Sequence, residues 1–91
     1  MPNRIIKESI LTSPNFNQLS LLAAQHFFRI LLRADDWGCL ECTPAVIRGT
    51  CYPLMDSVTA DKVDIWQKEL EQVNIIRRWE DGGREFATFC Q

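Results

Sequence analysis

The chain has 91 residues, which is enough for one hydrophobic core but not for two. A hydrophobic fraction of 46% and a charged fraction of 24% are typical of a folded domain and exclude a disordered chain. The net charge of −2 counts against tight, non-specific DNA binding, because dedicated nucleic-acid binders usually carry a basic excess.

No apolar run approaches the roughly 20 residues that span a bilayer, and the first ten residues lack the apolar core of a signal peptide. We therefore expect a cytoplasmic protein with no membrane contact. In that compartment the four cysteines are expected to be free thiols. The last residue directly follows a predicted strand, so we expect this single domain, residues 1–91, to be one part of a longer protein.

Residues 1–17 predict a lead-in arm ahead of a core that runs from residue 18 to residue 91. Ile5, Ile6 and Ile10 are spaced to contact a core or a partner chain, which favours a homo-oligomer. Ser13-Pro14-Asn15 predicts a turn within the arm.

The first helix is predicted from about Leu21 to Arg33. Ser20 is a suitable N-cap, because its hydroxyl can accept a hydrogen bond from an amide of the first turn. Apolar residues follow at helical spacing and form a wide stripe: Ala23, Ala24, Phe27, Phe28, Ile30, Leu31 and Leu32. A stripe of that width predicts a helix that is packed on more than one side.

Next, the sequence predicts a turn over 35–38, a short strand near Leu40 and two further helices. Thr43-Pro44 starts the second helix, which runs to about Cys51, since threonine caps and proline suits the first helical position. Ser57 or Thr59 can cap the third helix. Its buried face is predicted from three- and four-residue spacing: Val63, Trp66, Leu70 and Val73. Asn74 ends it, because asparagine tolerates the left-handed conformation.

A β-hairpin is predicted from strands at 75–80 and 84–90. We prefer Gly82-Gly83 as its two-residue loop over Asp81-Gly82, because this register places Trp79 opposite Phe86. The same register sets Glu80 opposite Glu85, which is unfavourable. The order of elements predicts an α+β fold, a winged helix-turn-helix with three helices and a C-terminal β-hairpin wing.

At this level the chain resembles the N-terminal winged-helix domain of phage and prophage replisome organisers, the DnaD-like replication initiation proteins. The resemblance covers nearly the whole chain and lies in the segments RIIKESI, FFRILLRADDWG, TPAVIRGTCYP and ELEQVNIIRRWEDGGREF. Asn74 stands where the family often has glycine, and Trp66 where a small residue is frequent. The resemblance implies a role in DNA replication, with origin DNA, a helicase or a helicase loader as partners, and with self-association.

The basic residues that this fold could offer to DNA lie on the third helix, on the wing and at Arg48 of the second helix. The third helix carries Lys62 and Lys68, but also four acids on the same outward face: Asp61, Asp64, Glu69 and Glu71. Such a face can equally be a solvated surface with internal ion pairs. The wing carries Arg77, Arg78 and Arg84, which suit phosphate or a charged edge strand, and Arg48 adds a fourth arginine. We therefore expect weak DNA binding, mainly through the wing.

No cofactor, metal or catalytic site is predicted. Cys39 and Cys42 form a C-x-x-C pair, but a structural zinc site needs four ligands. On a strand, two residues three positions apart would also point to opposite faces. His26 stands alone in the middle of a helix, without a visible nucleophile or second ligand. Beside DNA binding, two alternatives stay open: a protein-interaction module for self-association or helicase-loader docking, and a small transcriptional regulator.

Overall fold

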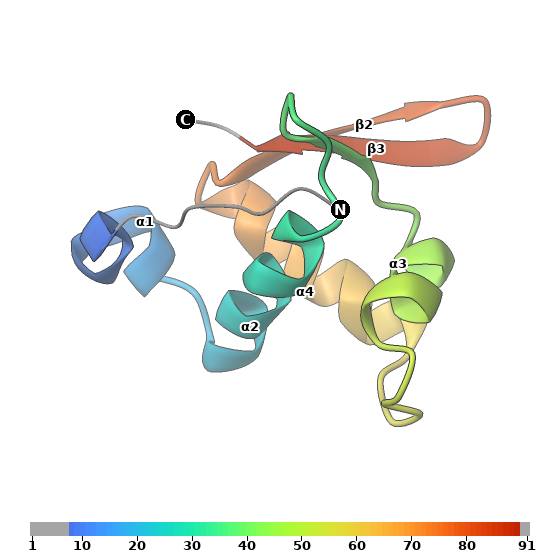
Figure 1. The fold of residues 1–91 in the computed structure, drawn as a ribbon, viewed down its shortest axis with the longest axis horizontal. Helices are drawn as coiled ribbons and strands as arrows, with labels where there is room; N and C mark the ends of the chain where they lie inside the picture. Colours follow the sequence, from blue (N-terminus) through green and yellow to red (C-terminus); the bar gives the residue numbers. More distant parts are fainter. Residues whose placement is uncertain (1–7, 90–91) are drawn as a thin grey trace.

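The computed structural model describes residues 8–89, and within them the chain is α+β, as predicted. It contains four α-helices and a three-stranded antiparallel sheet, an arrangement compatible with a small winged-helix-like domain (Figure 1). The elements are a 3₁₀ helix at Glu8–Thr12, then α1 (Pro14–Asn17), α2 (Leu21–Leu31), β1 (Cys39–Glu41), α3 (Pro44–Cys51), α4 (Ala60–Gln72), β2 (Ile76–Asp81) and β3 (Arg84–Phe89).

The short helix α1 corrects the sequence prediction of a turn at Ser13-Pro14-Asn15 and of three helices in all. Ser13 is its N-cap, and its hydroxyl accepts a hydrogen bond from the amide of Phe16 at 3.4 Å. Pro14 occupies the first turn, where its missing N–H costs nothing, so Ser-Pro starts a helix here. Ile10 is half-buried, whereas Ile5 and Ile6 lie outside the described residues.

Helix α2 begins where predicted, because the Ser20 hydroxyl accepts from the amide of Ala23 at 3.2 Å. It ends at Leu31, two residues before the predicted end, and Arg33 then donates its amide to the carbonyl of Ile30 in a tighter turn. The apolar stripe has neighbours on more than one side, as predicted, because Phe27 and Phe28 contact the ring of Phe16 and Phe27 also contacts Phe89, but it is not fully covered. Four apolar side chains of α2 and its C-terminal cap are exposed: Leu21, Leu22, Phe28 and Leu32.

Helices α3 and α4 complete the helical layer. Helix α3 has the predicted bounds, and Thr59 is the residue that caps α4, by accepting from the amide of Lys62 at 3.3 Å. The predicted inner face of α4 is confirmed at Val63, Trp66 and Leu70, with Gln67 buried beside them; Val73 is half-buried. Asn74 ends the helix with a φ of 62°, in the left-handed region that asparagine tolerates.

The sheet has the order β1-β3-β2, so the last strand in the sequence lies in its middle. The predicted hairpin register is confirmed: Gly82-Gly83 forms the loop with positive φ at both residues, and Trp79 faces Phe86. Glu80 also faces Glu85, as expected. Strand β2 begins at Ile76, one residue later than predicted. The predicted end of the last strand, at Cys90, lies outside the described residues.

One face of the sheet packs on the helices, which all lie on the same side of it in Figure 1. This inner face contributes Leu40, Ile76 and Ala87 to the core. From the helices come the buried side chains Ile30, Ile47, Val63 and Leu70, and the rings of Phe27 and Phe89 meet edge to face at 5.7 Å. The residues that alternate with the inner set along each strand therefore form an outer face that no described helix covers.

Candidate nucleic-acid interface

The exposed side of α4 is the first candidate surface, and its two lysines are partly engaged. The prediction of four acids on one outward face is wrong, because Asp64 and Glu71 contact Arg78 of β2 and Glu69 accepts hydrogen bonds from the amide and hydroxyl of Ser20. Of the four acids, only Asp61 is fully on the exposed side. Lys68 forms an ion pair with Asp64 at 3.0 Å, one helical turn away. Lys62 donates from Nζ to the carbonyl of Ser57 at 3.1 Å and has no carboxylate partner among the described residues. Hydrogen bonding from Lys68 and, beside it, from Arg78 lowers the pKa of Asp64 below its ordinary value, so this carboxylate stays charged.

Arg48 lies on α3 and is directed toward the loop that leads into α4. Its Nε donates to the carbonyl of Val58 at 3.1 Å, and its Nη2 lies 3.6 Å from a carboxylate oxygen of Asp56. The Asp56 side chain is fully exposed, so this ion pair contributes little. The backbone hydrogen bond nevertheless gives Arg48 a position within the fold, where it ties α3 to the start of α4.

Arg78 lies on the inner face of the sheet and joins β2 to α4. Its side chain is only 13% exposed, and its guanidinium nitrogens lie 3.3 Å from Asp64, 3.2 Å from Glu71 and 3.7 Å from Glu85. Two of these carboxylates come from α4 and one from β3. Arg78 therefore neutralises acids that would otherwise repel one another under the sheet, and this geometry leaves little of it for an external anion.

Arg77 and Arg84 lie on the outer face of the sheet. Arg84 pairs with Glu41 across the sheet through two bonds, from Nη2 to Oε1 at 2.6 Å and from Nε to Oε2 at 3.1 Å. Hydrogen bonding from Arg84 lowers the pKa of Glu41. Arg77 is exposed and has no ion pair with any residue between 8 and 89. The predicted wing cluster is thus divided between two faces, because neighbours on a strand point in opposite directions.

Two aromatic rings lie between these arginines on the same outer face. The rings of Trp79 and Phe86 are stacked, with centroids 6.0 Å apart and an interplanar angle of 22°. The guanidinium carbon of Arg84 lies 5.6 Å from the centroid of Phe86. Sequence reasoning found the Trp79–Phe86 pair, but it did not find that Arg77 and Arg84 flank the pair while Arg78 lies on the opposite face.

A buried polar group in the helical core was missed by sequence reasoning. His26 on α2 is fully buried, and its Nδ1 lies 2.7 Å from the hydroxyl of Tyr52. Gln67 on α4 is also fully buried and donates to the carbonyl of Cys42 at 3.1 Å. The pKa of His26 is lowered to about 4, mainly by burial and in addition by the nearby charge of Arg29, while Gln67 acts in the opposite direction. The sequence pattern alone does not indicate that His26, Tyr52 and Gln67 meet in the core.

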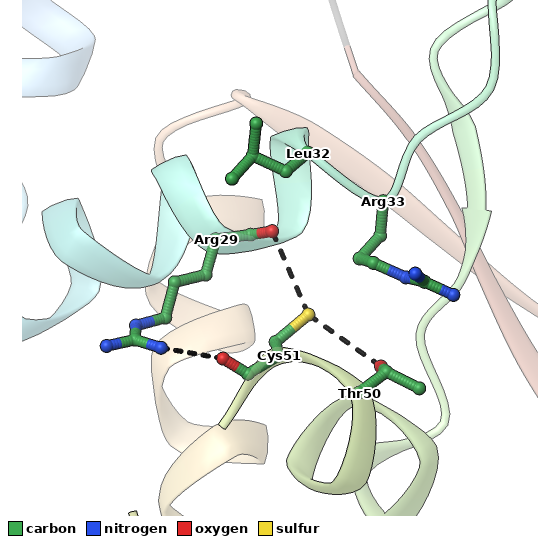
Figure 2. Close-up of a pocket in the computed structure, with 5 residues that line it drawn as sticks. All are labelled: Arg29, Leu32, Arg33, Thr50 and Cys51. Atoms are coloured by element: carbon green, nitrogen blue, oxygen red, sulfur yellow. Dashed lines mark hydrogen bonds between the residues drawn. The ribbon is translucent and has the colours of Figure 1, made fainter. Parts of the chain in front are cut away.

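A hollow of about 180 Å³ lies between the end of α2 and the end of α3, lined by Arg29, Leu32, Arg33, Thr50 and Cys51 (Figure 2). Arg29 is fixed there, because its Nη1 donates to the carbonyl of Cys51 at 2.7 Å and its guanidinium lies over the Tyr52 ring. Figure 2 shows Arg33 directed away from Arg29, so the two cations do not converge on one point. Burial raises the pKa of the Cys51 thiol, which disfavours a thiolate nucleophile.

The C-x-x-C pair is separated by its surroundings. Cys39 is half-buried on the outer face of β1, where its thiol lies 3.5 Å from the hydroxyl of Thr88. Cys42 is buried in the core, and burial raises its pKa to about 11. Between residues 8 and 89, no group of three histidine, cysteine, aspartate or glutamate side chains is arranged to hold a metal ion.

Comparison with known proteins adds no relative. No family model, no curated protein and no solved structure matches the chain. In the part of the chain that the structure describes, no helix is long and apolar enough to cross a membrane.

Proposed function

We propose that this chain is a DNA-binding winged-helix domain of a phage-type replication initiation protein, a replisome organiser. The observation that carries the proposal is the element order, in which α2, α3 and α4 are followed by the β2–β3 hairpin and β1 joins the sheet. In this reading α3 and α4 form the helix-turn-helix, α4 is the recognition helix and the hairpin is the wing. The sequence resemblance described above supports the replication role, a binding module in place of an enzyme, and a cytoplasmic location.

The DNA contacts are assigned to those lysines and arginines whose charge is free to meet a phosphate. Arg77 and Lys62 have no carboxylate partner among residues 8–89, and Arg84 and Lys68 are exposed enough to reach a phosphate while keeping one. Arg48 and Arg78 are assigned to holding the fold and not to DNA. Since Lys68 is paired with Asp64 and Lys62 donates to the carbonyl of Ser57, the wing contributes more to affinity than α4 does, and binding is weak and only modestly dependent on sequence.

The test is a titration of labelled duplex DNA at two salt concentrations. The Arg77→Ala/Arg84→Ala double variant is expected to weaken binding to all sequences alike and to make the salt slope shallower by about one unit for each lost phosphate contact. The Lys62→Ala/Lys68→Ala variant is expected to change binding less. The reverse order would assign the contact to α4, and a parent that binds no duplex at low salt would contradict the proposal.

A second candidate function, the protein-interaction module, is favoured by the open side of α2. Leu21 is 90% exposed, Leu22 57% and Leu32 52%, on a helix whose opposite side is buried in the core. Exposed apolar stripes of this kind are typical of protein contacts. A second copy of the chain, or a replication partner such as a helicase or its loader, would bury these leucines.

A further inference from the structure

We propose that the outer face of the sheet is a binding site for single-stranded nucleic acid, in which an unpaired base stacks on Trp79. This goes beyond the proposed duplex contact, because it concerns another nucleic-acid form and an aromatic surface that duplex phosphates do not need. The three-stranded sheet leaves this face open, with all described helices on its other side (Figure 1).

The aromatic pair supplies the platform. Trp79 stacks on Phe86 at 6.0 Å, and the indole remains 45% exposed after this contact. A cross-strand aromatic pair also stabilises the hairpin, but that role is complete without the half of the ring that faces solvent. Every nucleobase has a π-face, so an indole held against a second ring accepts unpaired bases with little regard to sequence.

Two guanidinium groups flank the platform along the strands. Arg77 precedes Trp79 by two residues on β2, so the two side chains lie on the same face, about 7 Å apart along the strand. Arg84 lies on the other side, 5.6 Å from the centroid of Phe86. This alternation of arginine and aromatic rings suits a backbone that runs past a stacked base, with a phosphate on either side of it.

The acids on the same face do not cancel this arrangement. Both oxygens of Glu41 accept from Arg84, and Asp81 is the cross-strand partner of Arg84 at the hairpin loop, so these two acids leave Arg77 uncompensated. The face is therefore close to neutral, with Arg77 and Arg84 against Glu41 and Asp81. Stacking supplies most of the affinity, and neutralisation of two phosphates at most gives a salt slope no steeper than about −1.4.

The experiment titrates the protein with oligothymidylate of about ten nucleotides while tryptophan fluorescence is recorded. Trp66 is buried and Trp37 lies in the turn before β1, so Trp79→Leu and Trp37→Leu separate the two exposed indoles. The parent and Trp37→Leu are expected to bind and to be quenched. Trp79→Leu is expected to lose about tenfold in affinity together with its quenching, and Trp79→Phe to retain most of the affinity.

The controls keep this result separate from the duplex proposal. Lys62→Ala/Lys68→Ala is expected to leave oligothymidylate binding unchanged, and Trp79→Leu is expected to leave duplex binding unchanged; circular dichroism verifies that each variant is folded. Equal binding by Trp79→Leu and the parent, or no binding by the parent at low salt, would overturn the inference. So would a Trp79→Leu variant that loses only self-association, since the sheet face would then be a protein contact.

Discussion

His26 shows how one enclosed side chain sets the response of the fold to acid. Its ring lies between Tyr52, which touches Nδ1, and Trp66, with Gln67 and the cation Arg29 near it. The ring is fully buried, and no carboxylate of residues 8–89 forms an ion pair with it that could stabilise an imidazolium. Protonating His26 in the folded state therefore places a charge in the core beside another positive charge.

We predict a loss of stability that begins below neutral pH. The pKa of His26 is 6.5 in the unfolded chain and about 4 in the fold, so the unfolded state binds the proton first. Stability is complete above pH 6.5 and falls as the pH drops towards 4, by about 3 kcal/mol. Urea unfolding at a series of pH values measures this. In His26→Gln the slope between pH 6.5 and 5 is expected to vanish, and near pH 4 only the loss from carboxylates such as Asp64 and Glu41, whose pKa values are lowered in the fold, is expected to remain; a parent-like slope would refute the assignment.

At the residue scale, the sequence predicted caps and turns better than it predicted partners. Ser20, Thr59, Asn74 and Gly82 act through local backbone chemistry, which depends only on near neighbours in the chain. The partner of Arg78 depends on which face of β2 meets α4, and that is decided by packing. Charge counting grouped Arg78 with Arg77, although the sheet places them on opposite faces.

At the scale of elements, the contact between β2 and α4 depends on Arg78. The strand lies over a helix that carries Asp64 and Glu71, and Glu85 on β3 adds a third carboxylate. The inner positions of β2 are Ile76, Arg78 and Glu80, so the strand has one apolar residue there and would pack weakly on such a helix without a counter-charge. The guanidinium converts a repulsive layer into an attractive one, and this explains why the wing carries an arginine that points inward.

Replacing Arg78 by methionine is expected to lower the free energy of unfolding by about 2 kcal/mol, because three carboxylates lose their common partner; the value allows for solvent screening at the half-exposed acids. Arg77→Met is the matched control on the next residue, and its effect is expected to stay within about 0.5 kcal/mol. Urea denaturation of both variants measures the difference. Equal costs for the two substitutions would contradict the structural role given to Arg78.

Element prediction was successful where period and cap agreed, as for α4. Helix α3 has the predicted bounds, but Thr43 does not cap it through its side chain, because its hydroxyl donates to Glu41 and accepts from the amide of Glu85. The prediction was wrong for the segment before α2, where Ser13-Pro14 is compatible with both a turn and a helix start, and the ring of Phe16 packed against Phe27 and Phe28 favours the helix. The width of the apolar stripe on α2 predicted burial on several sides. The described elements cover only part of that stripe. The same apolar pattern therefore accounts for the exposed surface on α2.

At the scale of the whole molecule, that open side of α2 predicts self-association. Two helices that bury their leucines against each other remove apolar surface from water, which is the main source of association free energy. We expect Leu21→Ser/Leu32→Ser to reduce the mass observed by light scattering at high protein concentration. Leu54→Ser is the control, because Leu54 is 95% exposed in the loop between α3 and α4. A parent that stays monomeric throughout would contradict this prediction.

Because β3 lies in the middle of the sheet, its position determines when the sheet can be completed during synthesis. Strand β3 follows all other described elements in sequence, yet it is the strand to which both β1 and β2 bond. A nascent chain that has emerged only as far as α4 has no partner strand for β1. Completion of the sheet therefore waits until residues 84–89 have left the ribosome, and a message cut before them yields a chain with two unpaired strands.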